Sequence, residues 1–160
     1  MGGPLLAQVN VARFRRPKDD PANAEYAAAL DAVAAAAEGG PGLVWRFDLR
    51  SADAADRRLA ADPHLFANLS VWTGIEPLRD FTYADPLHRA MMRRRREWFE
   101  RAEITLALWW VPADERPTLR GALDRLARLG RDGPSPAAFT FARAFDAEGR
   151  PVEAGTRHAA

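Results

Sequence analysis

The order of the apolar patterns along the chain restricts its fold more than any other feature. Runs in which apolar residues alternate with others, or follow one another directly, are typical of β-strands. Between these runs, apolar residues recur at the three- and four-residue spacing of helices. The predicted strands cover residues 5–14, 43–49, 65–72, 104–111 and 139–145.

The predicted helices have recognisable ends. The first begins at Asp20-Pro21 and ends at Gly39-Gly40. Thr73 and Glu76 have the spacing of a capping box, so a second helix begins there, and Asp85 before Pro86 predicts a new start. Thr118 begins the last helix and Gly130 ends it, whereas the polar stretch 51–63 predicts a loop. The apolar side chains of the first helix are Tyr26, Leu30, Val33 and Ala37.

The resulting succession is β-α-β-β-α-β, followed by a helix and a strand. The first six elements match the split βαβ order, which predicts an α+β fold of the ferredoxin-like kind, an antiparallel sheet with helices on one face. The 160 residues suffice for one domain, which we place at residues 5–145. We expect residues 146–160 to form a flexible C-terminal tail.

Such a sheet has a second face that its own helices leave uncovered. Here that face is rich in tryptophan and apolar residues, and it would be an exposed apolar patch on a monomer. Pairing two sheets across a twofold axis is the simplest way to bury it. We therefore expect a homodimer, arranged as a dimeric α/β barrel.

Composition excludes several classes of function. The formal net charge of +1 gives no electrostatic reason to expect nucleic-acid binding. The sequence contains no cysteine, which excludes disulfides and thiolate chemistry. No apolar run approaches the roughly 18 residues that span a bilayer. The chain start lacks the pattern of a secretory signal, so we expect a cytoplasmic location and no membrane partner.

The segment 85–102 reads as one helix whose apolar face contains cations. At about 100° per residue, Arg94 projects between Leu87 and Trp98, and His88 and Arg95 lie between this stripe and Phe99. A cation directed at a core needs a partner or a wet cavity. The segment is therefore the best candidate for one wall of a site, whereas the scatter of residues 93–96 around the helix speaks against a basic stripe for nucleic acid.

Polar side chains on the predicted strands suggest the opposite wall. Amides and hydroxyls beside tryptophans are what a small-molecule pocket needs, because apolar area supplies affinity and a few hydrogen bonds fix orientation. The alternative is that Asn10 and Asn68 only satisfy neighbouring groups in a plain dimer interface. On the second strand, either Arg46 with Val44 or Trp45 with Phe47 shares this face. The mixed faces are assigned as Gln8 and Asn10, then Asn68, Ser70 and Trp72, then Thr105, Ala107 and Trp109.

His88 is the histidine best placed to carry chemistry. It can be a general acid/base near neutral pH, or an axial ligand to an iron porphyrin. Alternatively, it is a helix-start histidine that hydrogen-bonds a backbone carbonyl. A single placed histidine cannot supply the three or four ligands of a zinc site.

These residues carry a resemblance to a known family. The combination of Leu6-Ala-Gln-Val-Asn-Val-Ala-Arg13, Asn68-Leu-Ser-Val-Trp72, Leu78-Arg-Asp-Phe-Thr-Tyr83, His88 with residues 93–99, Leu108-Trp-Trp-Val-Pro112 and Gly133-Pro-Ser-Pro-Ala-Ala-Phe-Thr-Phe141 resembles the DUF3291 family over residues 5–145. That family is similar in architecture to the dimeric α/β-barrel superfamily, which includes cofactor-independent monooxygenases, haem-degrading and haem-binding enzymes and polyketide-tailoring proteins.

The resemblance implies a function of the antibiotic biosynthesis monooxygenase-like type. Val71-Trp72 followed by Asp85-Pro-Leu-His88 resembles the Val-Trp and Ser-Pro-His pattern of quinol and antibiotic monooxygenases, whose histidine faces the cavity. Asn10, Trp72 and His88 also resemble the asparagine, tryptophan and histidine of the haem-degrading members, with His88 about one helical turn earlier.

We therefore expect oxygenation or tailoring of a hydrophobic aromatic or polyketide-like substrate without a cofactor. A haem protein and a non-catalytic ligand-binding or structural homodimer are the alternatives. The expected catalytic residues are His88, Asn10, Arg94 and Arg95, and the expected substrate-binding residues are Gln8, Asn68, Ser70, Trp72, Met92 and Trp109.

Overall fold

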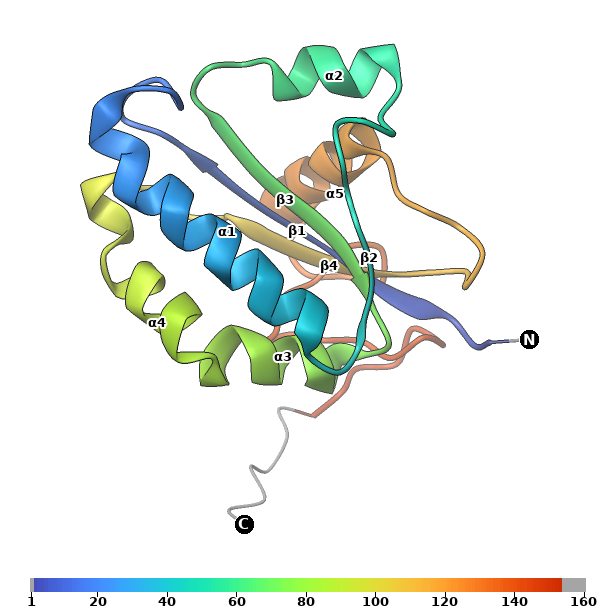
Figure 1. The fold of residues 1–160 in the computed structure, drawn as a ribbon. Helices are drawn as coiled ribbons and strands as arrows, with labels where there is room; N and C mark the ends of the chain where they lie inside the picture. The colour runs from blue at the N-terminus through green and yellow to red at the C-terminus, as the bar shows by residue number, and fades with distance from the viewer. Residues whose placement is uncertain (1, 154–160) are drawn as a thin grey trace.

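Four antiparallel strands form one sheet in the order β2-β3-β1-β4 (Figure 1). The computed structural model describes residues 2–153. It confirms the mixed α+β class and all four principal strands, although the second strand is shorter than expected. The strands are β1 (Leu5–Arg13), β2 (Leu43–Arg46), β3 (Leu65–Trp72) and β4 (Leu106–Val111).

The register of β1 divides the sheet into two unlike faces. Gln8 pairs with Ser70 and Asn10 pairs with Asn68, so these four side chains share one face. We call this the polar face. Ala7 and Val9 lie on the other face, together with their partners Val71 and Leu69 from β3 and Trp109 and Ala107 from β4. We call this the apolar face.

Helices cover both faces. Ala37 of α1 (Ala24–Gly39) and Leu78 of α3 (Ile75–Ala84) pack with Leu6 and Trp72 on the polar face. Ala122 and Leu129 of α5 (Leu119–Asp132) pack on the apolar face. Figure 1 shows α1 in front of the sheet and α5 behind it. The expectation that the second face stays uncovered is wrong, because the apolar side chains of α5 pack on it.

The segment 85–102 is not one helix. α4 (Pro86–Arg93) ends at Arg93, and a short 3-10 turn, η2 (Arg95–Glu97), follows. Trp98 and Phe99 are buried because the chain then turns back to the sheet, where Phe99 forms an isolated bridge with Phe14. Of the expected apolar stripe, only Trp98 and Phe99 are therefore buried, whereas Leu87 and Met92 of α4 are exposed.

Three further predictions are corrected. The stretch 51–63 contains the helix α2 (Ala54–Ala60), begun by Asp53, whose side chain accepts from Asp56 N. Residues 139–145 form no strand, because Phe139 alone pairs with Leu108 before the chain turns at residues 140–143. The last helix runs past Gly130 to Asp132, and Gly133 follows it with a φ of 76°.

The C-terminal segment begins as a turn rather than a free tail. Asp146 N donates to the Arg150 carbonyl, and Val152 N donates to the Ala144 carbonyl. The remainder of the expected tail, 154–160, lies outside the described residues. None of the helices in residues 2–153 has the length and apolar character needed to cross a membrane.

Candidate functional site

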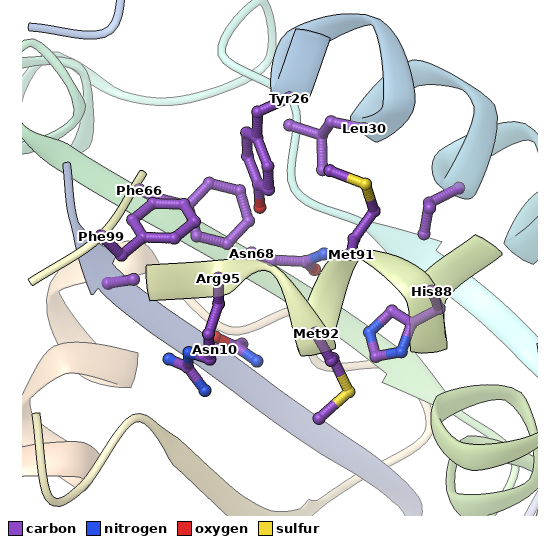
Figure 2. Close-up of a pocket in the computed structure, with 12 residues that line it drawn as sticks. Asn10, Tyr26, Leu30, Phe66, Asn68, His88, Met91, Met92, Arg95 and Phe99 are labelled. Atoms are coloured by element: carbon purple, nitrogen blue, oxygen red, sulfur yellow. The ribbon is translucent and has the colours of Figure 1, made fainter. Parts of the chain in front are cut away.

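A cleft lies on the polar face, between the sheet and the helices α1, α3 and α4. It consists of a small lobe of ≈ 100 Å³ and a large lobe of ≈ 250 Å³, which share part of their walls. Asn10 and Asn68 from the sheet, and His88 and Arg95 from residues 86–97, line both lobes (Figure 2). Several of the expected site residues therefore line one cavity within a single chain.

His88 is fixed by two contacts at the start of α4. Its backbone N–H donates to the carboxylate of Asp85, the N-cap residue, over 2.8 Å. Its ring Nδ1 lies 2.8 Å from the Thr82 carbonyl oxygen. Because a carbonyl oxygen can only accept, Nδ1 carries the proton, and in the neutral ring Nε2 keeps a lone pair. His88 thus makes the hydrogen bond to a backbone carbonyl that is expected of a helix-start histidine, and its Nε2 is still available as a base in the cleft.

A buried hydrogen-bond network forms the wall of the large lobe. Ser70 Oγ accepts from Gln8 Nε2 at 2.7 Å and from Trp72 Nε1 at 2.8 Å. Gln8 Nε2 also donates to Asn68 Oδ1 at 3.1 Å. These groups satisfy one another's hydrogen-bonding capacity. This agrees, for these residues, with the alternative that polar side chains of the sheet only satisfy neighbouring groups. They orient Trp72, whose indole lines the large lobe.

Three polar groups of the small lobe have no such partners. Among residues 2–153, the guanidinium of Arg95, the carboxamide of Asn10 and the hydroxyl of Tyr26 take part in no intramolecular hydrogen bond or ion pair by their side chains. Burial raises the pKa of the Tyr26 phenol, against a smaller opposite effect of the nearby Arg95 charge. Tyr26 therefore remains a neutral hydrogen-bond donor beside a cation.

Two expected site residues do not reach the cleft. Arg94 pairs with Glu25 and Glu97, and its guanidinium lies 4.8 Å from the ring centre of Trp98. The end of α4 at Arg93 takes it away from the position that a continuous helix predicted. Trp109 lies on the apolar face, where Arg125 stacks on its ring at 5.8 Å.

The misplacement of Trp109 has a simple cause. The predicted strand 104–111 took its phase from Thr105, but β4 begins at Leu106 and is apolar at every position, so alternation within it cannot show which side chains share a face. Pairing with β1 places Leu106, Leu108 and Trp110 on the polar face and Ala107 and Trp109 on the other. On β2 the pairing settles the open choice. Arg46 lies opposite Ser70 on the polar face, whereas Trp45 and Phe47 pack on the apolar face.

Sequence reasoning missed most of the small lobe. Tyr26 was predicted only as the first member of the apolar stripe of α1, although its hydroxyl is the one polar atom on that stripe. Phe66 and Phe99 come from elements distant in sequence and meet at 5.6 Å between ring centres. Of the expected residues, the cleft brings together Gln8, Asn10, Asn68, Ser70, Trp72, His88, Met92 and Arg95.

No group of three or more His, Asp or Glu side chains that could hold a metal ion occurs in the described part of the chain. Among the described lining residues of the cleft, His88 is the histidine, and its Nε2 could bind a metal-containing group.

Comparison with known proteins supports the family and little else. No curated protein matches the chain. The crystal structure of PA3566 from Pseudomonas aeruginosa is similar, with 11% sequence identity and a TM-score of 0.48 over 72% of this chain and 99% of that one. The model of the family described as "Domain of unknown function (DUF3291)" matches residues 5–155. Since this match covers nearly the whole sequence, the chain belongs to the DUF3291 family.

Proposed function

We propose that this protein is a small-molecule enzyme of the antibiotic biosynthesis monooxygenase-like type, acting on a hydrophobic aromatic or polyketide-like substrate with His88 as acid/base. One observation carries the proposal. His88 presents a fixed tautomer to a cleft in which the Arg95 guanidinium has no partner among the described residues. A base and a cation at one cavity are the groups that proton abstraction beside a carbonyl or on a phenol requires.

The chemistry begins with a proton transfer. Nε2 of His88 takes a proton from an acidic carbon or hydroxyl of the substrate, and Arg95 stabilises the resulting enolate or phenolate. In an oxygenation, dioxygen is the oxidant. The carbanion forms a bond to O₂, the peroxide takes back the proton, and loss of water converts a CH₂ group into a carbonyl. A tailoring reaction uses the same first step and consumes no oxygen.

The test measures this first step directly. The probe is benzoylacetone, a phenyl 1,3-diketone with an acidic CH₂ group, and the measurement is its exchange with D₂O by NMR. We expect the wild type to accelerate exchange and His88→Gln to reduce the acceleration by roughly 100-fold or more, the usual contribution of a general base.

His64→Gln is the matched control. His64 Nδ1 bonds the Phe14 carbonyl at 2.9 Å, but this histidine lines neither lobe. Exchange that is equally fast in wild type and His88→Gln would remove His88 from the mechanism. An oxygen electrode then separates oxygenation from the other tailoring reactions.

Haem binding fits the cleft less well. Nε2 of His88 is a suitable axial ligand. The two lobes of ≈ 100 Å³ and ≈ 250 Å³, however, lie together at the lower end of the roughly 300–1,000 Å³ of pockets for drug-sized ligands, and a porphyrin is larger than most of these ligands. Titration with haemin tests this alternative. A sharp Soret shift that His88→Ala abolishes would support haem binding, and no shift would contradict it.

The homodimer remains a proposal that needs another surface. It was expected because one sheet face should lie open, and α5 covers that face. Sedimentation velocity of the full chain provides the test. A mass of 17.7 kDa would contradict the homodimer, and twice this mass would support it.

A further inference from the structure

We infer that the ligand of the cleft is an aromatic carboxylate, whose single ring occupies the small lobe and whose carboxylate binds Arg95. This inference rests on the proposed function and names its substrate class. It draws on three features of the small lobe: a cation without a partner among residues 2–153, two neutral donors, and an aromatic wall.

The cation is the first feature. Arg95 is half-buried, and the arginine side chain is a cation in proteins. The adjacent Arg94 is an arginine with a structural role, because two carboxylates and an indole surround its guanidinium. Arg95 has no carboxylate partner among residues 2–153. An enolate formed only during reaction would leave this charge unpaired in the resting complex, whereas a carboxylate pairs with it from the start. The guanidinium has five N–H donors, so it can bind the carboxylate and still donate to the enolate.

The neutral donors are the second feature. Figure 2 shows Arg95 and Asn10 at the base of the small lobe and the hydroxyl of Tyr26 directed from α1 toward Asn68. Raised by burial, the pKa of Tyr26 keeps this hydroxyl protonated. An N–H fork, an amide N–H₂ and an O–H therefore line one small space, and the acceptor-only carboxylate is the group that can use all of them.

The aromatic wall is the third feature. The ring centre of Tyr26 lies 5.9 Å from that of Phe66 and 4.9 Å from that of Phe99. The lobe they enclose measures ≈ 100 Å³. An apolar cavity of roughly 150 Å³ accommodates benzene. The lobe is smaller than this, so one ring enters it when the flexible side chains of Met91 and Met92 move, and further rings would extend into the large lobe.

The experiment compares probes of one shape and different charge. Binding of benzoate and of uncharged benzyl alcohol to the full chain is measured by NMR titration. We expect the wild type to bind benzoate roughly 10- to 100-fold more tightly, as a charge-assisted hydrogen bond implies. Arg95→Met should abolish this preference. Arg94→Met, which removes the adjacent arginine outside the cleft, should retain it.

Two results would overturn the inference: equal affinity of the wild type for both probes, or an intact preference in Arg95→Met. Thermal unfolding without ligand shows whether each variant is folded. If Arg95→Met fails to fold, Arg95→Lys carries the test, because it keeps the charge but loses the planar fork. Benzoate affinity should then fall, and unchanged affinity would contradict the assigned contact.

The outcome is separable from that of the proposed function. Benzoate preference without His88-dependent exchange would contradict the enzyme and leave the ligand class standing. Exchange that depends on His88, without any preference for benzoate, would support the enzyme and contradict the ligand class.

Discussion

Ser70 is a single hydroxyl that two buried donors depend on. Gln8 Nε2 and Trp72 Nε1 both donate to its Oγ, and all three residues are buried. Replacement of Ser70 by Ala leaves the indole N–H without its acceptor. We expect the free energy of unfolding, measured by urea denaturation, to fall by about 1–3 kcal/mol.

The matched control for this substitution is Ser51→Ala. Ser51 Oγ donates to the Asp48 carbonyl in an exposed turn, so water replaces the lost bond. Its effect should stay within about 0.5 kcal/mol. Equal effects of the two substitutions would show that the Ser70 network does not contribute to stability.

Tyr26 gives the fold a pH dependence on the alkaline side. An unfolded tyrosine ionises near its ordinary pKa of 10.0, whereas burial raises the pKa of Tyr26 in the folded protein. Above a pH of 10.0 the folded state still holds the Tyr26 proton that the unfolded state releases, so the stability of the fold decreases as the pH rises. Urea midpoints from neutral pH to about pH 11 should therefore drop more steeply in wild type than in Tyr26→Phe. Parallel curves would contradict the raised pKa.

For single residues, the sequence predicts which face of a strand a side chain occupies where polar and apolar residues alternate. Gln8 and Asn10 alternate with Ala7 and Val9, so the members of the polar face of β1 were identified correctly. β4 has no polar residue to set its phase, and Trp109 was assigned to the wrong face. Tyr26 was missed because a tyrosine on an apolar stripe reads as core until its surroundings are known.

At the scale of elements, Asp56 joins two helices that the sequence separates. Its buried carboxylate accepts from Leu119 N at 2.8 Å and from Arg120 N at 3.2 Å, so a side chain of α2 caps the start of α5. Asp56→Ala should lower the free energy of unfolding by about 2–4 kcal/mol, because a buried amide loses its acceptor.

Hydrogen exchange locates this effect. The amides of Leu119 and Arg120 should lose protection in Asp56→Ala more than the amides in the middle of α5. Asp53→Ala is the control, since its exposed carboxylate bonds Asp56 N and the Arg120 side chain but neither of these amides. Unchanged protection at Leu119 in Asp56→Ala would contradict the cap.

Helix ends that depend on local chemistry were predictable, and ends that depend on packing were not. Asp85 and Thr118 cap their helices as expected, each accepting from a backbone N–H three residues on. No glycine or proline marks the end of α4 at Arg93. The chain turns there because Trp98 and Phe99 are buried against Phe14. The helix α2 escaped notice because its one buried residue, Asp56, is charged.

At the scale of the whole molecule, the sheet separates two packed layers. Leu129 of α5 is buried on the apolar face with Val9 and Trp109. Leu129→Ala should cost about 2–5 kcal/mol of unfolding free energy by leaving a cavity. Leu87→Ala, at a residue that is 36% exposed, should cost about 0.5 kcal/mol or less. Similar losses in the two variants would contradict the role of α5 as a core element.

The succession of elements was sufficient to predict the sheet and its antiparallel class, because local periodicity and caps define each element. It could not place the last helix, since an amphipathic helix fits either face of an open sheet. Only the complete packing shows that α1, α3 and α4 already occupy the polar face, which leaves the apolar face to α5.

This arrangement allows the two sides of one sheet to change independently. Substitutions at Asn10, Asn68 or Met92 alter the shape of the chamber without touching the hydrophobic layer beneath α5. Related chains can therefore diversify what they recognise while the tolerance of the scaffold to mutation stays the same.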